Sequence, residues 1–299
     1  MEMDWKIRTV VLTRRSSYYK KLAGNGVVFI AVVVDDIIAA ATHLQTLRWL
    51  ADCLRATYKI TELGEPAYLV GLSISRDHSA ITVHQNQFVR DLAATFKQTK
   101  CNAVPTPAVP GDVTSGQSPQ LPPGHLYLSL IGSLLWCTIS RPDIAVAVAI
   151  ACSKSIRPTE ADWKAALRIL RYLLHTPDVV LAFTVQAASC PAICTYVDAA
   201  WANAPKSRSR YGYIVCVFGN PVMWEAKVTT MVCLSTAEAE YYAAVHAAKS
   251  VLWLASLVAE ITASPVPTAI IYEDNAACIR MATNPIVSAR NRHFSMRMW

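Results

Sequence analysis

The sequence predicts a mixed fold class, α+β in its first third and α/β in its last third, spread over more than one domain. Short runs rich in β-branched residues alternate with segments of helical periodicity, and a stretch rich in proline, glycine, serine and threonine divides them at residues 102–124. The chain has 299 residues, of which 53% are hydrophobic, so its length and apolar content suffice for two ordinary domains.

The composition indicates an intracellular protein of the cytoplasm or nucleus that is neither secreted nor membrane-bound. A net charge of +7 fits a polyanionic partner without proving one. The nine cysteines are scattered and contain no C-x-x-C spacing, which argues against a zinc module or a secreted disulfide scaffold. The first residues lack a signal-peptide pattern, and the apolar runs 27–34 and 144–152 are shorter than the ~20 residues of a membrane helix.

The first third opens with a polar, basic stretch, which an apolar strand over 27–34 follows. Asp35 and Asp36 interrupt the apolar character, which resumes at 37–40, so the pattern predicts a hairpin with two carboxylates at its tip. A turn that simply favours aspartate is the plainer interpretation, and spacing alone favours it. Further along we predict a helix, two strands and a short helix, at 42–58, 68–74, 80–84 and 85–96.

Two helical segments follow the proline-rich stretch, one at 127–155 with a break near Arg141-Pro142 and one at 159–174. In the second we expect one side to be buried and another to be basic. The buried stripe is Trp163, Leu167, Leu170 and Leu174, and the basic side is Lys164, Arg168 and Arg171. A basic helix side is usually a solvated face, and only its neighbours would make it a phosphate contact.

The last third predicts a three-stranded meander, a helix, a returning strand and a short helix, which together make an α/β domain of roughly 110 residues. The strands are expected at 193–198, 213–218, 221–224 and 269–274, the helices at 236–260 and 276–282, and a turn at Gly219-Asn220.

The first helix of this domain is rich in alanine and carries two acids near its start, Glu238 and Glu240, with Ser235 or Thr236 available as N-cap. Residues two apart on a helix diverge by roughly 200°, so the two carboxylates cannot both face one site. We expect one to be a solvated first-turn charge and the other to be the functional residue.

Three acids that are distant in sequence can converge in this domain, because Asp198 and Asp274 each end a strand and Glu240 lies near the start of the helix. Carboxylates that meet repel one another unless cations bind between them, and hard oxygen ligands suit Mg²⁺ or Mn²⁺. Two such ions ~4 Å apart would activate a water and stabilise the leaving oxygen in phosphodiester cleavage. Three unrelated surface acids are the alternative, with equal weight on this pattern alone.

Ordered motifs run through the first two thirds of the chain. They are Val33-Val34-Asp35-Asp36-Ile37-Ile38, Leu63-Gly64-Glu65 with Tyr68-Leu69-Val70-Gly71, Ile131-Gly132-Ser133-Leu134-Leu135 with Ser140-Arg141-Pro142-Asp143-Ile144, and the run from Asp162 to Leu173. In this order they resemble the Y-V-D-D-I-L hairpin, the L-G-E-x-x-Y-F-L-G primer-grip region, the I-G-S-L and T-R-P-D-I thumb signature and the H-W-x-A-x-K-R-I-L-R-Y-L helix of Pol polyproteins from copia-type long-terminal-repeat retrotransposons.

The last third continues this resemblance. Its motifs are Tyr196-Val197-Asp198-Ala199-Ala200-Trp201-Ala202, Ser209-Arg210-Tyr211-Gly212-Tyr213, Ser235-Thr236-Ala237-Glu238-Ala239-Glu240-Tyr241 and Asp274-Asn275-Ala276-Ala277-Cys278-Ile279. They resemble Y-S-D-A-D-W-A, S-T-S-G-Y, S-S-T-E-A-E-Y and D-N-Q-S-A-I of the family's RNase H domain. The resemblance implies that Asp198, Glu240 and Asp274 are catalytic residues and metal ligands, with Glu238 in a supporting position.

The resemblance also implies a domain order. A partial reverse-transcriptase palm with its primer-grip region would occupy 1–100, a proline-rich linker 101–126, a helical thumb or connection 127–185, and an RNase H-like domain without its C-terminal end 186–299. Asp35 and Asp36 would then be the remnant of a polymerase site.

Several positions depart from the family pattern. Val33 replaces a tyrosine, Ala200 replaces the second aspartate of Y-S-D-A-D-W-A, and Ser295 stands where RNase H has its fourth carboxylate. A neutral hydroxyl supplies no negative charge, so we expect metal binding on that side to weaken. Before Asp35 the chain offers only Glu2 and Asp4 as further acids, so we expect polymerase activity to be lost through truncation.

The resemblance therefore implies RNase H-type two-metal hydrolysis, with Mg²⁺ or Mn²⁺, of the RNA strand in RNA/DNA hybrids. The nucleic acid would bind along Lys164, Arg168, Arg171, Lys206, Arg208 and Arg210. The alternative is a catalytically inactive, transposon-derived fragment that keeps the fold and some nucleic-acid binding. An intact reverse transcriptase or another Pol product is left open as a partner.

Overall fold

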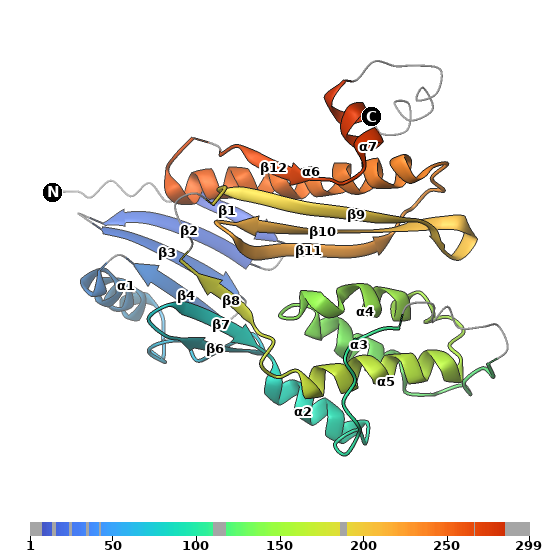
Figure 1. Cartoon of the computed structure of the whole chain (residues 1–299). Helices are drawn as coiled ribbons and strands as arrows, with labels where there is room; N and C mark the ends of the chain where they lie inside the picture. The colour runs from blue at the N-terminus through green and yellow to red at the C-terminus, as the bar shows by residue number, and fades with distance from the viewer. Residues whose placement is uncertain are drawn as a thin grey trace. The chain divides into compact units, whose positions relative to one another are not determined.

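The computed structural model of the chain divides into two compact units, Met1–Ser75 and Arg76–Trp299 (Figure 1). The residues that it describes are 8–13, 16–23, 26–33, 36–41, 43–109, 118–185, 190–265 and 267–284. The expected domain limits at residues 100, 126 and 185 do not coincide with this division, because the short helix that follows residue 85 packs against the later helices.

The first unit contains an antiparallel sheet of four strands in the order β1-β2-β3-β4. These are β1 (Arg8–Thr13), β2 (Ser16–Ala23), β3 (Gly26–Val33) and β4 (Asp36–Ala41). The predicted hairpin is confirmed, since β3 pairs with β4 as far as Val33 opposite Asp36. β1 and β2 are additional to the predicted elements, because their sequences show no regular alternation of apolar and polar residues.

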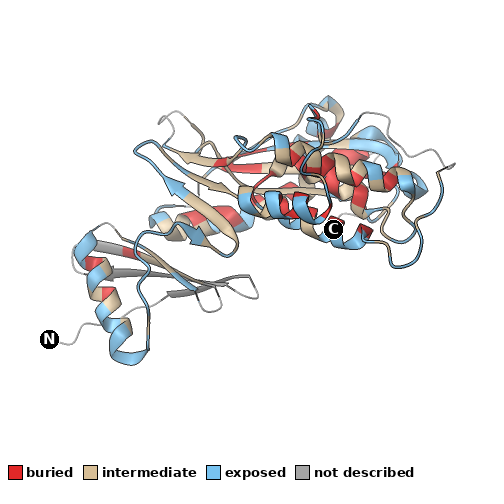
Figure 2. Ribbon diagram, turned by 90° about the horizontal axis from the view of Figure 1, so that it is seen from below, coloured by how far each residue is buried: buried red, intermediate tan, exposed pale blue. Residues whose placement is uncertain are grey.

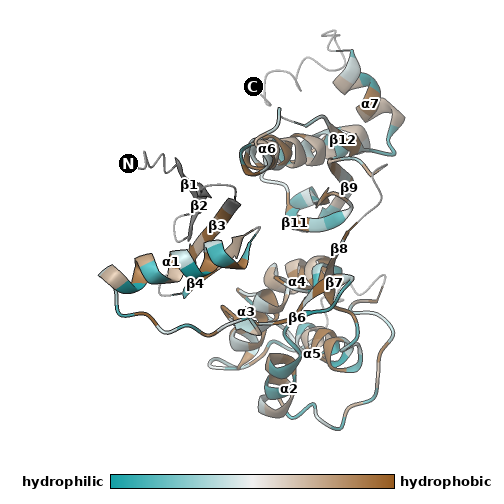
Figure 3. Ribbon diagram, turned by 90° about the vertical axis from the view of Figure 1, so that its left-hand side faces the viewer, coloured by the Kyte–Doolittle hydropathy of each residue, from teal (hydrophilic) through white to brown (hydrophobic). Residues whose placement is uncertain are grey.

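Helix α1 (Leu44–Thr57) follows the sheet and confirms the predicted amphipathic helix. Figure 3 shows hydrophilic and hydrophobic residues alternating along it, and Thr46 and Leu50 are buried. The strand predicted at 68–74 is instead a hairpin of β5 (Tyr68–Leu69) and β6 (Leu72–Arg76). The chain reverses there because both turn residues, Val70 and Gly71, adopt positive φ angles of 47° and 79°.

The second unit contains a helical group built around one apolar core. Its helices are α2 (Asn86–Thr95), α3 (Tyr127–Cys137), α4 (Ala145–Cys152) and α5 (Glu160–His175). A short 3₁₀ helix, η1 (Pro142–Ile144), separates α3 from α4 and confirms the predicted break, since proline cannot continue a helix. One strand precedes these helices in the sequence, β7 (Ala80–His84), and one follows them, β8 (Leu181–Thr184). The two strands pair with each other in antiparallel fashion.

Helix α5 begins with a capping box, in which the Thr159 hydroxyl accepts from the Asp162 amide and the Asp162 carboxylate accepts from the Thr159 amide at 2.8 Å. Its buried face is broader than the predicted stripe and rotated from it. Ala166, Ile169, Leu170 and Leu173 are buried, whereas Trp163, Leu167 and Leu174 are only partly buried. The reason is that α2, α3 and α4 all pack against α5, so the helix is covered on more than one side.

Cys137 at the end of α3 is enclosed in this core, whereas Cys53 of α1 is exposed. Burial raises the pKa of the Cys137 thiol to about 12, although nearby Arg141 acts in the opposite direction. Because the thiolate is the nucleophile, we expect iodoacetamide to alkylate Cys53 in the native protein and to spare Cys137 until urea unfolds the chain. Peptide mass spectrometry after timed labelling measures both rates, and equal rates would contradict the burial of Cys137.

A second sheet follows, in the order β11-β10-β9-β12. Its strands are β9 (Ile193–Ala204), β10 (Arg208–Val217), β11 (Asn220–Val228) and β12 (Ala269–Tyr272). The first three form the predicted antiparallel meander, and β12 returns parallel to β9. The turn before β11 is Phe218-Gly219, one residue earlier than predicted, because both residues have positive φ and Asn220 already pairs with Val217.

Helix α6 (Thr236–Thr262) packs along one face of this sheet, and α7 (Ala276–Thr283) follows β12 (Figure 1). By length and composition alone α6 could cross a membrane, and it is longer than either apolar run noted in the sequence. Its buried residues Val251, Leu254 and Val258 join Ile193 and Val215 of the sheet in one cluster. Figure 2 shows such buried positions along the elements of the second unit.

Candidate metal centre

The end of β12 lies beside the middle of β9 in the second sheet. β12 runs parallel to β9 with Tyr272 opposite Tyr196, and the two rings stack with centroids 4.9 Å apart. Asp198 and Asp274 each lie two residues beyond this pair. β9 continues to Ala204, so the prediction that Asp198 ends a strand is wrong. The parallel pairing nevertheless brings Asp198, within β9, and Asp274, just after β12, to neighbouring positions.

The start of α6 supplies the helical acids. Ser235 is the N-cap, and its hydroxyl accepts a hydrogen bond from the Glu238 amide. The Glu238 carboxylate in turn accepts from the amide of Leu234, just before the cap. The expected solvated first-turn charge is therefore wrong, since Glu238 is fully buried and Glu240 is 6% exposed. The contact with Leu234 satisfies one Glu238 oxygen, and the other is buried without a hydrogen-bond partner among the described residues.

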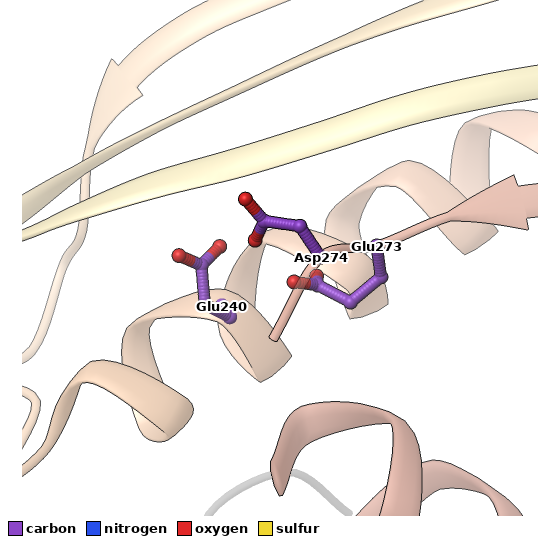
Figure 4. A group of neighbouring side chains, drawn as sticks. All are labelled: Glu240, Glu273 and Asp274. Atoms are coloured by element: carbon purple, nitrogen blue, oxygen red, sulfur yellow. The ribbon is translucent and has the colours of Figure 1, made fainter. Parts of the chain in front are cut away.

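Glu240 of α6, Glu273 and Asp274 form a group of three carboxylates, each with an oxygen within 4.8 Å of the others. Figure 4 shows the three side chains converging, Glu240 from the helix and the other two from the segment after β12. Asp198 is exposed and lies outside this 4.8 Å group, but it is near enough that its charge acts on Glu240. The structure thus brings Glu240 and Asp274 together as predicted, with Asp198 beside them.

The electrostatics of the group favour a bound cation. Burial and then the charges of Glu273, Asp198 and Asp274 raise the pKa of Glu240 to about 7, and the amide of Ala199 acts in the opposite direction. One oxygen of Glu240 and one of Glu273 are buried without a hydrogen-bond partner among the described residues. Mg²⁺ and Mn²⁺ prefer charged carboxylate oxygens as ligands, and an oxygen that accepts no hydrogen bond from the protein is available to such an ion. These residues therefore fit Mg²⁺ or Mn²⁺.

Glu273 is the member of the group that sequence reasoning missed. The sequence analysis selects Asp274 of the adjacent pair because it ends the expected strand 269–274 and matches the family motif. In a strand that continued to Asp274, Glu273 would point to the opposite face. β12 ends at Tyr272, however, and the next two residues are free of the strand's alternation. The Asn275 amide donates to one Glu273 oxygen at 2.9 Å and leaves the other for the cluster. Adjacent acids directly after a strand are the signal that could have found it.

The proposed polymerase remnant lies in the first unit. Asp36 is the exposed first residue of β4, and Asp35 lies outside the described residues. The structure therefore describes only one member of this pair.

The basic side of α5 has partners within the protein. Arg168 donates to the backbone oxygen and hydroxyl of Thr106, and Arg171 donates twice to the backbone oxygen of Asn102. These bonds hold the segment before residue 110 against α5, so the two arginines have a structural role that the sequence did not indicate. Lys164 is exposed. Phosphate binding by all three stays a prediction.

The second basic group lies in the hairpin between β9 and β10. Lys206 is exposed, while Arg208 and Arg210 are half-buried. One terminal nitrogen of Arg210 is buried without a hydrogen-bond partner among the described residues, and burial lowers the pKa of its guanidinium. Ser295, which the resemblance aligns with a fourth carboxylate, lies outside the described residues.

Comparison with known proteins places these features in context. Residues 5–110 match the family described as reverse transcriptase (RNA-dependent DNA polymerase). The retrovirus-related Pol polyprotein from transposon RE2 of Arabidopsis thaliana is 27% identical over 97% of this chain, which covers 20% of that protein. The corresponding polyprotein from transposon TNT 1-94 of Nicotiana tabacum is 27% identical over 94% of the chain and 22% of its own length.

A shorter relative also matches. The secreted RxLR effector protein 161 of Plasmopara viticola is 36% identical over 43% of this chain, which covers 90% of that protein. No solved structure matches the chain. The chain spans about a fifth of the length of the Pol polyproteins that it resembles.

Proposed function

Because the chain belongs to the Pol polyprotein family of copia-type retrotransposons, we propose that residues 193–284 contribute an RNase H-type nuclease that hydrolyses the RNA strand of RNA/DNA hybrids. One observation carries the proposal: Glu240, Glu273 and Asp274 converge, and one oxygen each of Glu240 and Glu273 is buried without a hydrogen-bond partner among the described residues. Three converging carboxylates are what two-metal phosphodiester cleavage requires of a protein.

Each of these side chains would have a distinct role in the proposed reaction. Glu240, Glu273, Asp274 and Asp198 would hold divalent ions, which when bound would supply an activated water and charge stabilisation at the phosphate. The Asn275 amide orients Glu273, and the Ser235 cap with Glu238 fixes the first turn from which Glu240 projects. The hairpin that carries Lys206, Arg208 and Arg210, called the Lys206 hairpin, would bind the phosphate backbone, since cations displace the counterions of nucleic acids.

Cleavage of a labelled hybrid tests the proposal. The full chain is incubated with an RNA/DNA hybrid in Mg²⁺ or Mn²⁺, with EDTA as the blank and the same RNA as a single strand for comparison. We expect metal-dependent cleavage of the RNA in the hybrid and intact single-stranded RNA. An uncut hybrid in both metals would refute the nuclease assignment.

A binding protein without catalysis is the second candidate, and Ser295 in place of the family's fourth carboxylate is the observation that favours it. Salt titration of hybrid binding separates the two. Phosphate contacts predict a steep, linear fall of log affinity with log salt, whether or not the hybrid is cut. Salt-dependent binding without cleavage selects this second candidate.

We expect no DNA synthesis by this polypeptide on its own. Asp36 begins β4, while β1, β2 and β3 contain no acidic residue over their described lengths, so these strands supply no further carboxylate to a polymerase metal site. The assay measures nucleotide incorporation on a primed RNA template in Mg²⁺. Incorporation above that of the Asp36→Asn variant would contradict the expectation.

A further inference from the structure

Trp201 is a large side chain held in a fixed position at the surface of the second sheet. It follows Asp198 by three residues on β9, and 47% of it is exposed. Its indole N–H nevertheless donates to the backbone oxygen of Cys233 at 2.9 Å. The ring is therefore anchored at its nitrogen while much of its apolar surface faces solvent.

Buried polar contacts fix the backbone around Trp201. The hydroxyl of Ser209 accepts from the amide of Ala202, and the Ser209 amide donates to the hydroxyl of Thr229 at 3.1 Å. Ser209, Thr229 and Cys233 are all buried, and Cys233 lies two residues before the N-cap of α6. The segment that starts the Glu240 helix therefore also sets the position of the Trp201 ring.

The chain that follows Asp198 carries positive charges only, as far as residue 224. No acidic residue occurs from residue 199 to residue 224, and the hairpin that follows Trp201 contains Lys206, Arg208 and Arg210. An exposed aromatic ring with cations near it in the chain is a combination by which proteins hold nucleic-acid strands, since the ring stacks on a base and the cations contact phosphates.

We propose that Trp201 is a positioning residue that packs against a nucleotide of the hybrid, with the Lys206 hairpin on the adjoining phosphates. The inference rests on the proposed function and names one side chain through which the hybrid would be held. Stacking on aromatic rings tolerates any base, so this contact would add affinity without sequence preference.

The test measures hybrid binding in EDTA, where no cleavage occurs, by fluorescence anisotropy of the full chain. Trp201→Ala is compared with Trp253→Ala, because Trp253 is 40% exposed but lies thirteen residues, roughly 20 Å, beyond Glu240 on α6. We expect roughly tenfold weaker binding for Trp201→Ala and no change for Trp253→Ala. Trp201→Phe keeps a ring without the N–H donor and should retain most of the affinity.

A second measurement reports direct contact. An RNA strand containing bromouridine is photo-crosslinked in the hybrid, and peptide mass spectrometry should find the crosslink at Trp201. Equal affinity of the Trp201→Ala and Trp253→Ala variants, equal losses in Trp201→Phe and Trp201→Ala, or an absent crosslink would overturn the inference. A chain that binds through Trp201 but leaves the hybrid uncut in Mg²⁺ and Mn²⁺ would contradict the nuclease assignment and leave this inference standing.

Discussion

Replacing Glu240 with glutamine is expected to reduce metal-dependent cleavage of an RNA/DNA hybrid by roughly 10²–10³-fold, the loss typical of one removed transition-state electrostatic contact. Glutamine keeps the shape of the side chain but removes the charge from the centre of the carboxylate group. The measurement is the single-turnover rate in saturating Mg²⁺ with the protein in saturating excess over the hybrid, so that weaker binding of the metal or of the hybrid does not enter the result.

The matched control is Glu260→Gln, which removes a carboxylate from the same helix twenty residues, or about 30 Å, from Glu240. It should cleave at the wild-type rate. Equal rates for the Glu240→Gln variant and the wild type would remove Glu240 from the site, whereas equal losses in both variants would show that the helix, not the carboxylate, is at fault.

Stability in EDTA separates loss of chemistry from loss of fold. The pKa of Glu240 is raised from its ordinary 4.5 to about 7, so between these values the folded state holds a proton that the unfolded state has released. The charged carboxylate therefore destabilises the fold as pH rises through this window. We expect Glu240→Gln to melt at least as high as the wild type above about pH 7, although it cleaves far more slowly.

The sequence predicts elements better than it predicts side-chain environments in this protein. The meander, the α6 helix and the break before α4 follow from local periodicity and proline. By contrast, Glu238 is buried because it contacts the Leu234 amide, and Glu273 joins the site because β12 ends at Tyr272. Both facts depend on where the regular backbone stops, and periodicity places such ends within a few residues only.

Arg141 shows the same limit from another direction. In the sequence it is one letter of the motif that resembles the thumb signature, with no stated role. In the structure its guanidinium binds the Asp143 carboxylate through two nitrogens, at 2.9 and 2.7 Å, and also donates to the backbone and hydroxyl oxygens of Thr176 at the end of α5. It also lies over the Tyr172 ring, 5.4 Å from the centroid. The motif thus ties η1 to α5, a contact that only the folded chain reveals.

Replacing Arg141 with methionine should destabilise the second unit by about 3 kcal/mol, the lower end of the range for breaking a buried ion pair. The arginine side chain is 7% exposed, so its loss leaves Asp143 without its ion-pair partner and Thr176 without the donor to its oxygens. The hydrogen bond of Asp143 with Tyr172 and its 29% exposure limit the loss. Urea unfolding followed by circular dichroism measures the difference. The control is Lys227→Gln, which removes a lysine that is 64% exposed and should cost less than about 1 kcal/mol.

Two further measurements decide whether the ion pair is the cause. Burial raises the pKa of Asp143, but the hydrogen bonds and charge of Arg141, with the hydrogen bonds of Tyr172 and of the backbone, together lower it by more, so the net value lies below its ordinary 3.8. The ion pair contributes fully to stability above pH 3.8, the ordinary pKa of the carboxyl group, and this contribution disappears as the pH falls through the lowered pKa of Asp143. The difference in unfolding free energy between wild type and variant should therefore be constant from about pH 6 to pH 8 and shrink below about pH 4. The double variant Arg141→Met, Asp143→Leu should recover part of the loss, because no unpaired charge is left behind. A double variant no more stable than Arg141→Met alone would show instead that packing of the arginine against Tyr172 carries the stability.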